Sequence, residues 1–350
     1  MYNGANEDSQ NGIPGFKEDQ MRCLALFVTG VGVVVGTVVM QPSAAQAQEN
    51  KNTGLRLSVV GIAVKDYPKS QNFYEKVMGF PVAFTFSSAD GKRTTTYYQM
   101  SRDTFLEMQS ATTDVPPGLT HVHIVIDDLN ATIARLRRAG LPAAARNATT
   151  PTTLTEPGVA QPSNVKNANV FDPNGIRLEL NELIPESLTK KATESWSAAQ
   201  ESKNTSLRLS VVGIAVKDSS ESQNFYERVM GFRVAFKFPS ADGKRTTTYY
   251  QMSRDAFLEM QSATADVRPG FTHVHILTDD LNATVARLRQ AGVPAASGNA
   301  TTLNTLGNVV NVSQGSHVKN ANVFDPDGIR LELNEYIPES LTKKAAESWR

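Results

Sequence analysis

The tripeptide His-Val-His occurs twice in this chain and contains four of its five histidines. The first copy is His121–His123 and the second is His273–His275. Imidazoles two residues apart on a strand project from the same face. There they can bind a divalent metal or transfer protons near neutral pH. Each tripeptide is therefore a candidate centre of chemistry, and the chain carries two of them.

The two tripeptides belong to a long internal repeat. Residues Leu55–Trp196 read almost letter for letter as Leu207–Trp349, with an offset of 152 that becomes 153 near the end. A unit of this length matches a domain and is too long for a solenoid repeat. We therefore predict two domains of the same fold, at 54–183 and 207–336, each long enough to bury a core of its own.

Each repeat is predicted to contain two similar modules in the order strand, helix and three strands. In the first module, Ser58–Val64 is a short apolar strand, and Asp66–Met78 has helical spacing with a proline near its start and a glycine after its end. The Asp90-Gly91 turn indicates a hairpin between the strands that follow. The second module comprises strands His121–Ile126, Val165–Phe171 and Ile176–Leu180, with a helix at Asp128–Ala139.

Strand periodicity places the polar residues of a repeat on one face. The residues between and after the two histidines are apolar, so His121 and His123 point to the opposite face of their strand. The same alternation in the neighbouring strands leaves Glu107, Arg177 and Glu179 opposite the apolar side chains. The equivalent residues of the second repeat are His273, His275, Glu259, Arg330 and Glu332.

This organisation resembles the vicinal oxygen chelate superfamily, which includes glyoxalase I, extradiol dioxygenases and bleomycin resistance proteins. The motifs that carry the resemblance are VGIAVKDYPKSQNFYEKVMGF in the first module, and THVHIVIDDLNATIARLRRAG with FDPNGIRLEL in the second. The resemblance covers nearly the whole of each repeat. It implies an α+β fold of four βαβββ modules paired into two glyoxalase-like domains, each with a cleft formed by curved mixed sheets.

The resemblance also implies a metal site in each cleft, with ligands from the first and last strands of each module. Carried over by motif, these positions fall on Val59, Glu107, His121 and Glu179. Valine cannot bind a metal, so three ligands remain, and one imidazole with two carboxylates suits Zn²⁺, Ni²⁺, Mn²⁺ or Fe²⁺. The corresponding residues of the second repeat are Val211, Glu259, His273 and Glu332.

Other polar residues are assigned to roles beside the metal. A base for proton abstraction, which is a glutamate in glyoxalase I, is predicted at Glu179 or Glu107, with His123 as the second candidate. His123 lies roughly 6.6–6.8 Å along the strand from His121, and we predict it as a base or hydrogen-bond donor. Arg177 is predicted to hold an anionic group of a substrate, with a plain surface cation as the alternative. The corresponding residues of the second repeat are Glu332, His275 and Arg330.

Two classes of function remain open. The first is metal-dependent lyase or isomerase chemistry on a small substrate with vicinal oxygens, in which the metal acts as a Lewis acid. The second is non-catalytic binding of a small molecule, as in bleomycin resistance proteins, and the valine at position 59 favours it. A ring-cleaving dioxygenase is disfavoured, because its two-histidine, one-carboxylate triad needs a second histidine ligand.

The two repeats diverge most in one segment, which is Pro151–Lys166 in the first and Leu303–Lys319 in the second. Loops on a rigid scaffold often carry specificity. We therefore predict that the two clefts differ in the small molecule they accept. Neutral drift in an exposed loop is the alternative.

The charge of the chain indicates its partners, and the N-terminal segment indicates its location. The chain has 35 basic and 35 acidic residues and no basic run, which argues against nucleic acid as a partner. Residues 21–47 contain a basic start, an apolar stretch and Ala45-Gln46-Ala47 as a cleavage site, which together indicate a secretory signal. An uncleaved membrane anchor is the alternative.

We therefore predict an exported protein, periplasmic or secreted, without stable membrane association after cleavage. The single cysteine, Cys23, lies within the signal, so no thiol chemistry is expected in the mature chain. A homodimer is left open. Residues 1–20 are predicted to be a mis-called start, 184–206 a helical linker and 337–350 a C-terminal helix.

Overall fold

The structure is a computed structural model that describes residues 54–349 except 89, 146–148, 198–206, 241, 295–304 and 314. The predicted start at 1–20 and the predicted export signal at 21–47 lie outside the described residues. None of the helices in the described part is long and apolar enough to cross a membrane.

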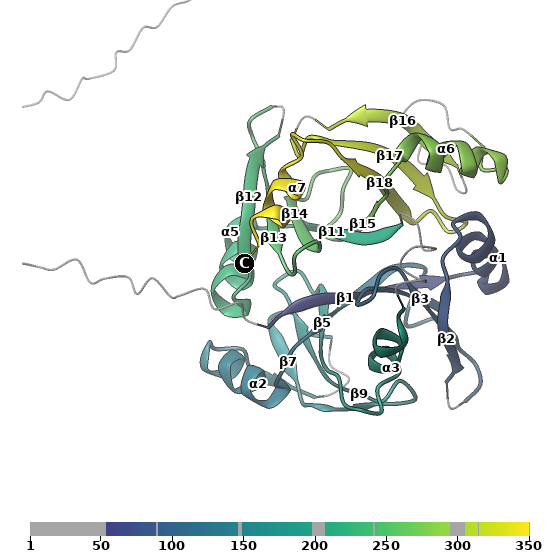
Figure 1. The fold of residues 1–350 in the computed structure, drawn as a ribbon. Coiled ribbons are helices and arrows are strands. Elements are labelled where there is room, and N and C mark those ends of the chain that lie inside the picture. The colour runs from purple at the N-terminus through teal and green to yellow at the C-terminus, as the bar shows by residue number, and fades with distance from the viewer. Residues whose placement is uncertain are drawn as a thin grey trace, which may run out of the picture. The chain divides into compact units, whose positions relative to one another are not determined.

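Each repeat contributes its own series of strands and helices, in the predicted order (Figure 1). The first repeat comprises β1 (Arg56–Val64), α1 (Tyr67–Asn72), the π-helical turn η1 (Phe73–Val77), β2 (Val82–Ser87), β3 (Thr94–Gln99), β4 (Phe105–Ser110), β5 (Gly118–Val125), α2 (Leu129–Arg138), β6 (Ala143–Ala144), β7 (Thr153–Thr155), β8 (Gly158–Ala160), β9 (Val165–Phe171), β10 (Arg177–Glu182) and α3 (Leu188–Ser195). The second repeat comprises β11 (Arg208–Val216), α5 (Ser219–Asn224), η2 (Phe225–Met230), β12 (Arg233–Pro239), β13 (Thr246–Gln251), β14 (Phe257–Ser262), β15 (Gly270–Leu277), α6 (Leu281–Gln290), β16 (Leu306–Val312), β17 (Val318–Phe324), β18 (Arg330–Tyr336) and α7 (Leu341–Glu347).

The strands of a repeat form one mixed sheet. The order is β2-β3-β4-β1-β5-β10-β9-β7-β6 in the first repeat, with β8 beside β9, and β12-β13-β14-β11-β15-β18-β17-β16 in the second. The first strands of the two modules, β1 and β5, pair antiparallel at the centre, so modules pair within a repeat. The predicted α+β fold of two glyoxalase-like units is confirmed.

The helix predicted at Asp66–Met78 is present in two parts. Asp66 caps α1 by accepting a hydrogen bond from the Lys69 backbone N–H, which satisfies one of the free donors at a helix N-terminus. The chain then widens into η1, where Phe73 and Tyr74 are both buried. This turn brings Tyr74 to the boundary between the repeats.

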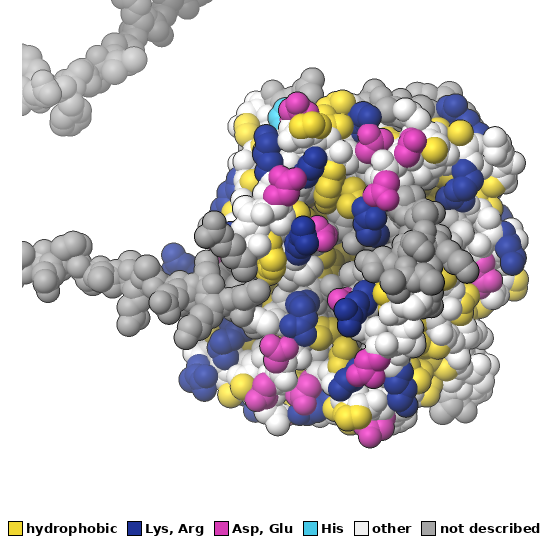
Figure 2. Space-filling view, viewed as in Figure 1, with side chains coloured by type: hydrophobic (Ala, Val, Ile, Leu, Met, Phe, Trp, Pro, Cys, Tyr) yellow, Lys and Arg dark blue, Asp and Glu magenta, His cyan; other side chains and the backbone are white. Residues whose placement is uncertain are grey.

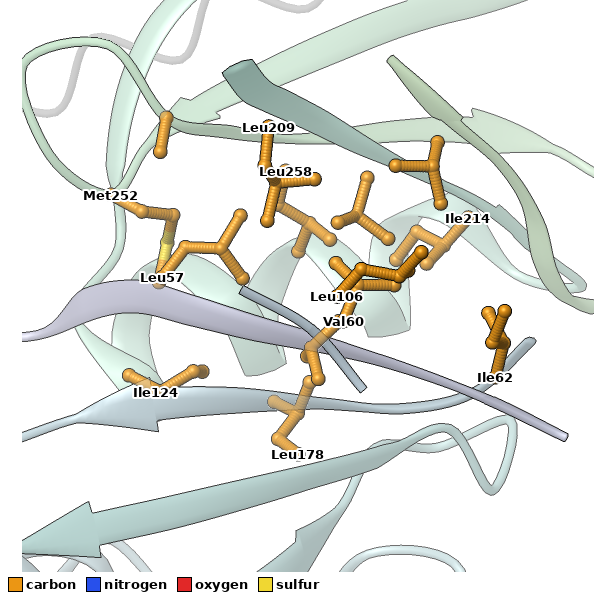
Figure 3. Packing of buried hydrophobic residues seen from close by; sticks show 14 of the residues in the cluster. Leu57, Val60, Ile62, Leu106, Ile124, Leu178, Leu209, Ile214, Met252 and Leu258 are labelled. Atoms are coloured by element: carbon orange, nitrogen blue, oxygen red, sulfur yellow. The ribbon is translucent and has the colours of Figure 1, made fainter. Parts of the chain in front are cut away.

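The two sheets share a single hydrophobic core. Buried apolar side chains of both repeats belong to one cluster. Figure 3 shows Val60, Ile62 and Leu106 of the first repeat close to Leu209 and Ile214 of the second. The structure differs here from the expectation of a separate core for each repeat, because the buried side chains of both sheets and of the helices on them pack into one cluster.

Turns at the end of each repeat join it to the first helix of the other. Asp325 accepts hydrogen bonds from two backbone N–H groups of its own turn and one from the Tyr74 hydroxyl at 2.9 Å. Asp172 accepts the equivalent hydrogen bond from Tyr226 at 3.0 Å. Each of these turns therefore makes a buried hydrogen bond between the repeats.

The Asp325–Tyr74 contact predicts a pH-dependent stability. Burial raises the pKa of Asp325 from 3.8 to about 6, against hydrogen bonds that lower it. The native state therefore holds this proton more tightly than the unfolded state, so stability from this group is greatest below pH 4 and falls as pH rises to about 6. We expect the unfolding free energy of the wild type, relative to Asp325→Asn, to fall by up to about 3 kcal/mol across this window.

Urea unfolding of both proteins at pH 4 and pH 7 measures this difference. Asparagine keeps an acceptor for the two backbone N–H groups and cannot titrate, so it isolates the effect of the proton. A difference in stability that stays constant with pH would show that Asp325 titrates at its ordinary value.

Charged side chains of both signs are interspersed over the face seen in Figure 2. This distribution agrees with the equal numbers of basic and acidic residues in the chain. The face shown therefore lacks the clustered positive charge expected of a nucleic-acid-binding surface.

Candidate metal centre

The site of the first repeat is built around a glycine on the central strand. Gly61 of β1 lies between Glu107 of β4 and His121 of β5 in the register of the sheet. A Cβ atom at Gly61 would lie only 2.3 Å from His121 Cε1. The imidazole therefore occupies the space over Gly61, and it reaches across β1 to place Nε2 at 3.4 Å from Glu107 Oε2.

His123 joins the same cluster. Its Nε2 lies 2.7 Å from His121 Nε2 and 3.2 Å from Glu107 Oε2. The spacing of the two residues along the strand suggested a larger separation, but the side chains lean toward each other and their ring centroids are 4.7 Å apart. Glu107, His121 and His123 thus form a buried group whose ligand atoms lie within 4.8 Å of one another.

Neighbouring polar groups orient the two imidazoles. His121 Nδ1 lies 2.7 Å from Thr120 Oγ1. His123 Nδ1 lies 2.9 Å from the Asn181 amide, whose orientation with the oxygen toward His123 also lets its nitrogen donate to Glu179 Oε1 at 3.2 Å. In that orientation Nδ1 of His123 carries the hydrogen, so Nε2 presents its lone pair to the cluster.

Glu107 is held in place from the side opposite the histidines. The Tyr97 hydroxyl donates a hydrogen bond to Glu107 Oε2 at 2.7 Å. Tyr97 is itself buried, and it packs with Val59 and Phe105. Partners of this kind fix the direction in which a metal-binding side chain points.

The electrostatics of the cluster favour a bound cation. Burial raises the pKa of Glu107, but the two imidazoles outweigh burial and hold it well below its ordinary value. Burial, with Arg177, lowers the pKa of His121 to about 4. Burial also lowers the pKa of His123, but Glu179 and Glu107 outweigh it and the net direction is upward. The ionised carboxylate of Glu107 therefore lies beside the neutral imidazole of His121 and beside the imidazole of His123, whose raised pKa favours positive charge.

The donor set fits a divalent metal. Two imidazole nitrogens and one carboxylate oxygen are the ligands that Zn²⁺, Mn²⁺ or Fe²⁺ accept. Ligands at about 2.1 Å from a tetrahedral metal lie roughly 3.4 Å apart. The separations in this cluster are 2.7, 3.2 and 3.4 Å, so a small outward shift of the imidazoles makes room for the ion.

The second repeat reproduces the cluster. Glu259, His273 and His275 form the equivalent buried group. The two Nε2 atoms lie 2.6 Å apart, and Glu259 Oε2 lies 3.5 and 3.3 Å from them. The Tyr249 hydroxyl donates to Glu259 at 2.7 Å, and a Cβ at Gly213 would lie 2.2 Å from His273 Cε1.

Glu179, predicted as a third ligand, lies beside the cluster. Its Oε1 is 3.8 Å from His123 Nε2 and accepts a hydrogen bond from Asn167 at 2.7 Å. Its Oε2 accepts from Arg177 at 3.2 Å. Glu332 in the second repeat has the same neighbours, with Oε2 at 3.9 Å from His275 Nε2 and 3.2 Å from Arg330.

The valine at the fourth predicted position belongs to an apolar cluster. Val59 is 1% exposed and packs with Tyr97 and Phe105. Val211 has the same surroundings in the second repeat. The position is thus filled by packing, and the second histidine of the tripeptide supplies a donor atom elsewhere in the cluster.

A cavity of about 270 Å³ opens onto the first cluster. Its wall includes Glu107, His121 and His123, together with Glu179 and the predicted substrate-binding residue Arg177. The divergent segment Pro151–Lys166 contributes four wall residues, Ala160 to Ser163. The segment predicted to set ligand preference is therefore in contact with the cavity, while the preference itself stays a prediction.

Gly61 and Gly213 are site residues that the sequence interpretation missed. Each is a lone glycine in an otherwise apolar strand, where glycine weakens packing and often marks a close approach of another group. That signal could have identified both positions. It could not have identified the imidazole that fills the space, because the partner comes from a neighbouring strand.

Comparisons with known proteins agree with the fold. The family model described as Glyoxalase/Bleomycin resistance protein/Dioxygenase superfamily matches residues 56–180 and 208–333. No functionally curated protein matches the chain. Matches to solved structures are at 13–16% identity for the examples that follow and bear on the fold alone.

Three solved structures illustrate the likeness. The Mn(II)-bound glyoxalase of Novosphingobium aromaticivorans has 15% identity and a TM-score of 0.57, over 80% of this chain and 81% of that one. The 2,3-dioxygenase LapB of Pseudomonas sp. KL28 has 16% identity and a TM-score of 0.59, over 81% and 93%. The 2,2',3-trihydroxybiphenyl 1,2-dioxygenase of Sphingomonas wittichii has 13% identity and a TM-score of 0.56, over 85% and 94%.

Proposed function

Because the chain belongs to the Glyoxalase/Bleomycin resistance protein/Dioxygenase superfamily, we propose that each repeat is a metal-dependent catalytic site for a small substrate with two adjacent oxygen atoms. The observation that carries the proposal is the meeting of two Nε2 atoms at 2.7 Å beside a buried carboxylate. When the Nδ1 atom of each imidazole carries its hydrogen, both Nε2 atoms present lone pairs to the same point. Two lone pairs facing each other at this distance need a proton or a metal ion between them.

A divalent metal bound by Glu107, His121 and His123 supplies Lewis acidity toward the two substrate oxygens. The protein supplies the remaining groups. Tyr97 and Asn181 hold the ligands in position. The cavity beside the cluster is large enough to admit a small molecule.

Glu179 is the proposed proton acceptor. Burial raises its pKa, but His123 and Arg177 outweigh burial and lower it below its ordinary value, so the carboxylate is ionised at neutral pH. It lies on the cavity wall and is not needed to complete the triad. It is therefore free to take a proton from a carbon next to a substrate oxygen. Glu332 has this role in the second repeat.

A ring-cleaving dioxygenase is the second candidate, and one observation favours it. The triad has two histidines and one carboxylate, the set that non-haem Fe(II) oxygenases use. The sequence interpretation disfavoured this function because a second histidine ligand was missing. In the triad, His123 is the second histidine that the sequence interpretation lacked.

Turnover by separately metal-loaded protein tests these functions. We expect about two metal ions per chain, one for each triad, and turnover that disappears after chelation and returns with metal. Conversion of α-ketoaldehyde adducts by the Zn²⁺, Ni²⁺ or Mn²⁺ form without oxygen supports the lyase or isomerase. Oxygen-dependent cleavage of catechols by the Fe²⁺ form alone supports the dioxygenase. Protein that retains metal and binds these compounds without turnover contradicts both and leaves the non-catalytic binding protein.

We also propose that the protein is exported. The support is the basic start, apolar stretch and Ala45-Gln46-Ala47 site within residues 21–47. N-terminal sequencing of protein from the native host is expected to give Gln48 as the first residue. Recovery of a chain that still contains the apolar stretch would favour the membrane-anchor alternative.

A further inference from the structure

The carboxylates on the cavity wall have more hydrogen-bond partners within the protein than the arginines have. Its two carboxylates already have partners within the protein, since Glu107 accepts from Tyr97 and Glu179 accepts from Asn167 and Arg177. Neither carboxylate therefore needs a cationic group from a ligand.

The arginines on the same wall are less well satisfied. Arg177 uses one Nη2 contact for Glu179, and its Nε is buried without a hydrogen-bond partner. Arg93, at the start of β3, is half-buried on the cavity wall. Its guanidinium has no hydrogen bond or ion pair with any residue that the structure describes, and its charge contributes only a little to the lowered pKa of the exposed Asp90.

The charge balance points to an anionic ligand. With His121 and His123 neutral as metal ligands, Arg93 and Arg177 offset Glu107 and Glu179, so the wall residues sum to zero. A divalent metal in the triad then leaves the cavity with two excess positive charges. A ligand with one carboxylate and one ionised oxygen beside the metal neutralises both, and a charge-assisted hydrogen bond to guanidinium is among the stronger polar contacts available.

The size of the cavity limits this ligand. Its volume of about 270 Å³ lies just below the range of roughly 300–1,000 Å³ for pockets that hold drug-sized molecules. Phe86 and Pro162 add apolar wall surface. We therefore infer that the substrate is a small carboxylate with two adjacent oxygens, and that Arg93 pairs with its carboxylate group. This inference rests on the proposed function.

The second repeat has Arg245 at the position of Arg93, so both arginines are replaced together. The test variant is Arg93→Gln with Arg245→Gln. The matched control is Lys92→Gln with Lys244→Gln, which removes the same charge from the exposed neighbouring residue. Lys92 is not part of the cavity wall.

The probes are two pairs in which the second member keeps both adjacent hydroxyls and adds one carboxylate, catechol against 2,3-dihydroxybenzoate and propane-1,2-diol against glycerate. Isothermal titration calorimetry of Zn²⁺-loaded protein measures their affinities without turnover. In the wild type and the lysine control, at least one carboxylate is expected to bind about tenfold or more tightly than its neutral partner. The ratio is expected to fall close to one in the arginine variant.

Two results would overturn the assignment. One is that neither carboxylate binds more tightly than its neutral partner, which includes the case in which neither binds. The other is a preference that survives the arginine substitutions unchanged. Metal content measured on the same samples tests the proposed function separately. If the protein holds two metal ions per chain but does not prefer the carboxylate, only the inference about the substrate is wrong.

Discussion

Replacing His123 and His275 by alanine is expected to remove the bound metal from both repeats. Each variant site loses one of three donor atoms that lie within 4.8 Å of one another. Loss of a partner that only orients a ligand typically costs about 10–100-fold in metal affinity, and loss of a ligand costs more. Metal content after dialysis is expected to fall from about two ions per chain to nearly none, as it does for His121→Ala with His273→Ala.

The matched comparison is Glu179→Gln with Glu332→Gln. Glutamine keeps the shape of the side chain and a hydrogen-bond acceptor for Asn167, and Glu179 lies beside the triad. This variant is expected to retain its metal and to lose turnover, since it lacks the proposed proton acceptor. If the histidine variant instead keeps its metal and the glutamine variant loses it, the ligand set is the one carried over from the family motif, with Glu107, His121 and Glu179.

The polar face of each sheet could be predicted because a strand alternates its side chains strictly. That rule placed Glu107, His121, His123 and Glu179 on one face, and the structure places all of them on the wall of one cavity. The rule fixes only the side of the sheet on which a residue lies. It does not say which side chains meet, because rotation about the side-chain bonds moves an imidazole nitrogen by several ångströms.

The meeting of His121 with Glu107 depends on strands that are distant in sequence. β4 and β5 both pair with β1, and Gly61 is the residue between them. Neither the parallel β1–β4 register nor the antiparallel β1–β5 register follows from a local pattern. The same limit applies to Tyr74 and Asp325, whose contact joins positions 251 residues apart.

Replacing Gly61 and Gly213 by alanine is expected to weaken metal binding selectively, although no ligand is changed. The added Cβ would lie 2.3 Å from Cε1 of His121 and 2.2 Å from Cε1 of His273. Neither glycine has the positive φ that disfavours other residues, so the backbone accepts alanine and the imidazole must move. We expect metal affinity to fall about 10–100-fold, as for loss of an orienting contact, and the unfolding free energy to fall by about 1–3 kcal/mol from overpacking.

A double-mutant cycle separates the imidazole from every other cause. In a His121→Ala background the imidazole is gone from the space over Gly61, so Gly61→Ala is expected to cost little or to stabilise the strand slightly. The cycle uses the first repeat because the Thr272 hydroxyl would still lie 2.7 Å from a Cβ at Gly213. Chemical denaturation of the four metal-free proteins measures the coupling. An equal cost in both backgrounds would mean that the alanine disturbs the sheet itself. If the loss of unfolding free energy disappears when the imidazole is removed, the lack of a side chain at Gly61 on β1 is what allows His121 on β5 to take its position as a metal ligand.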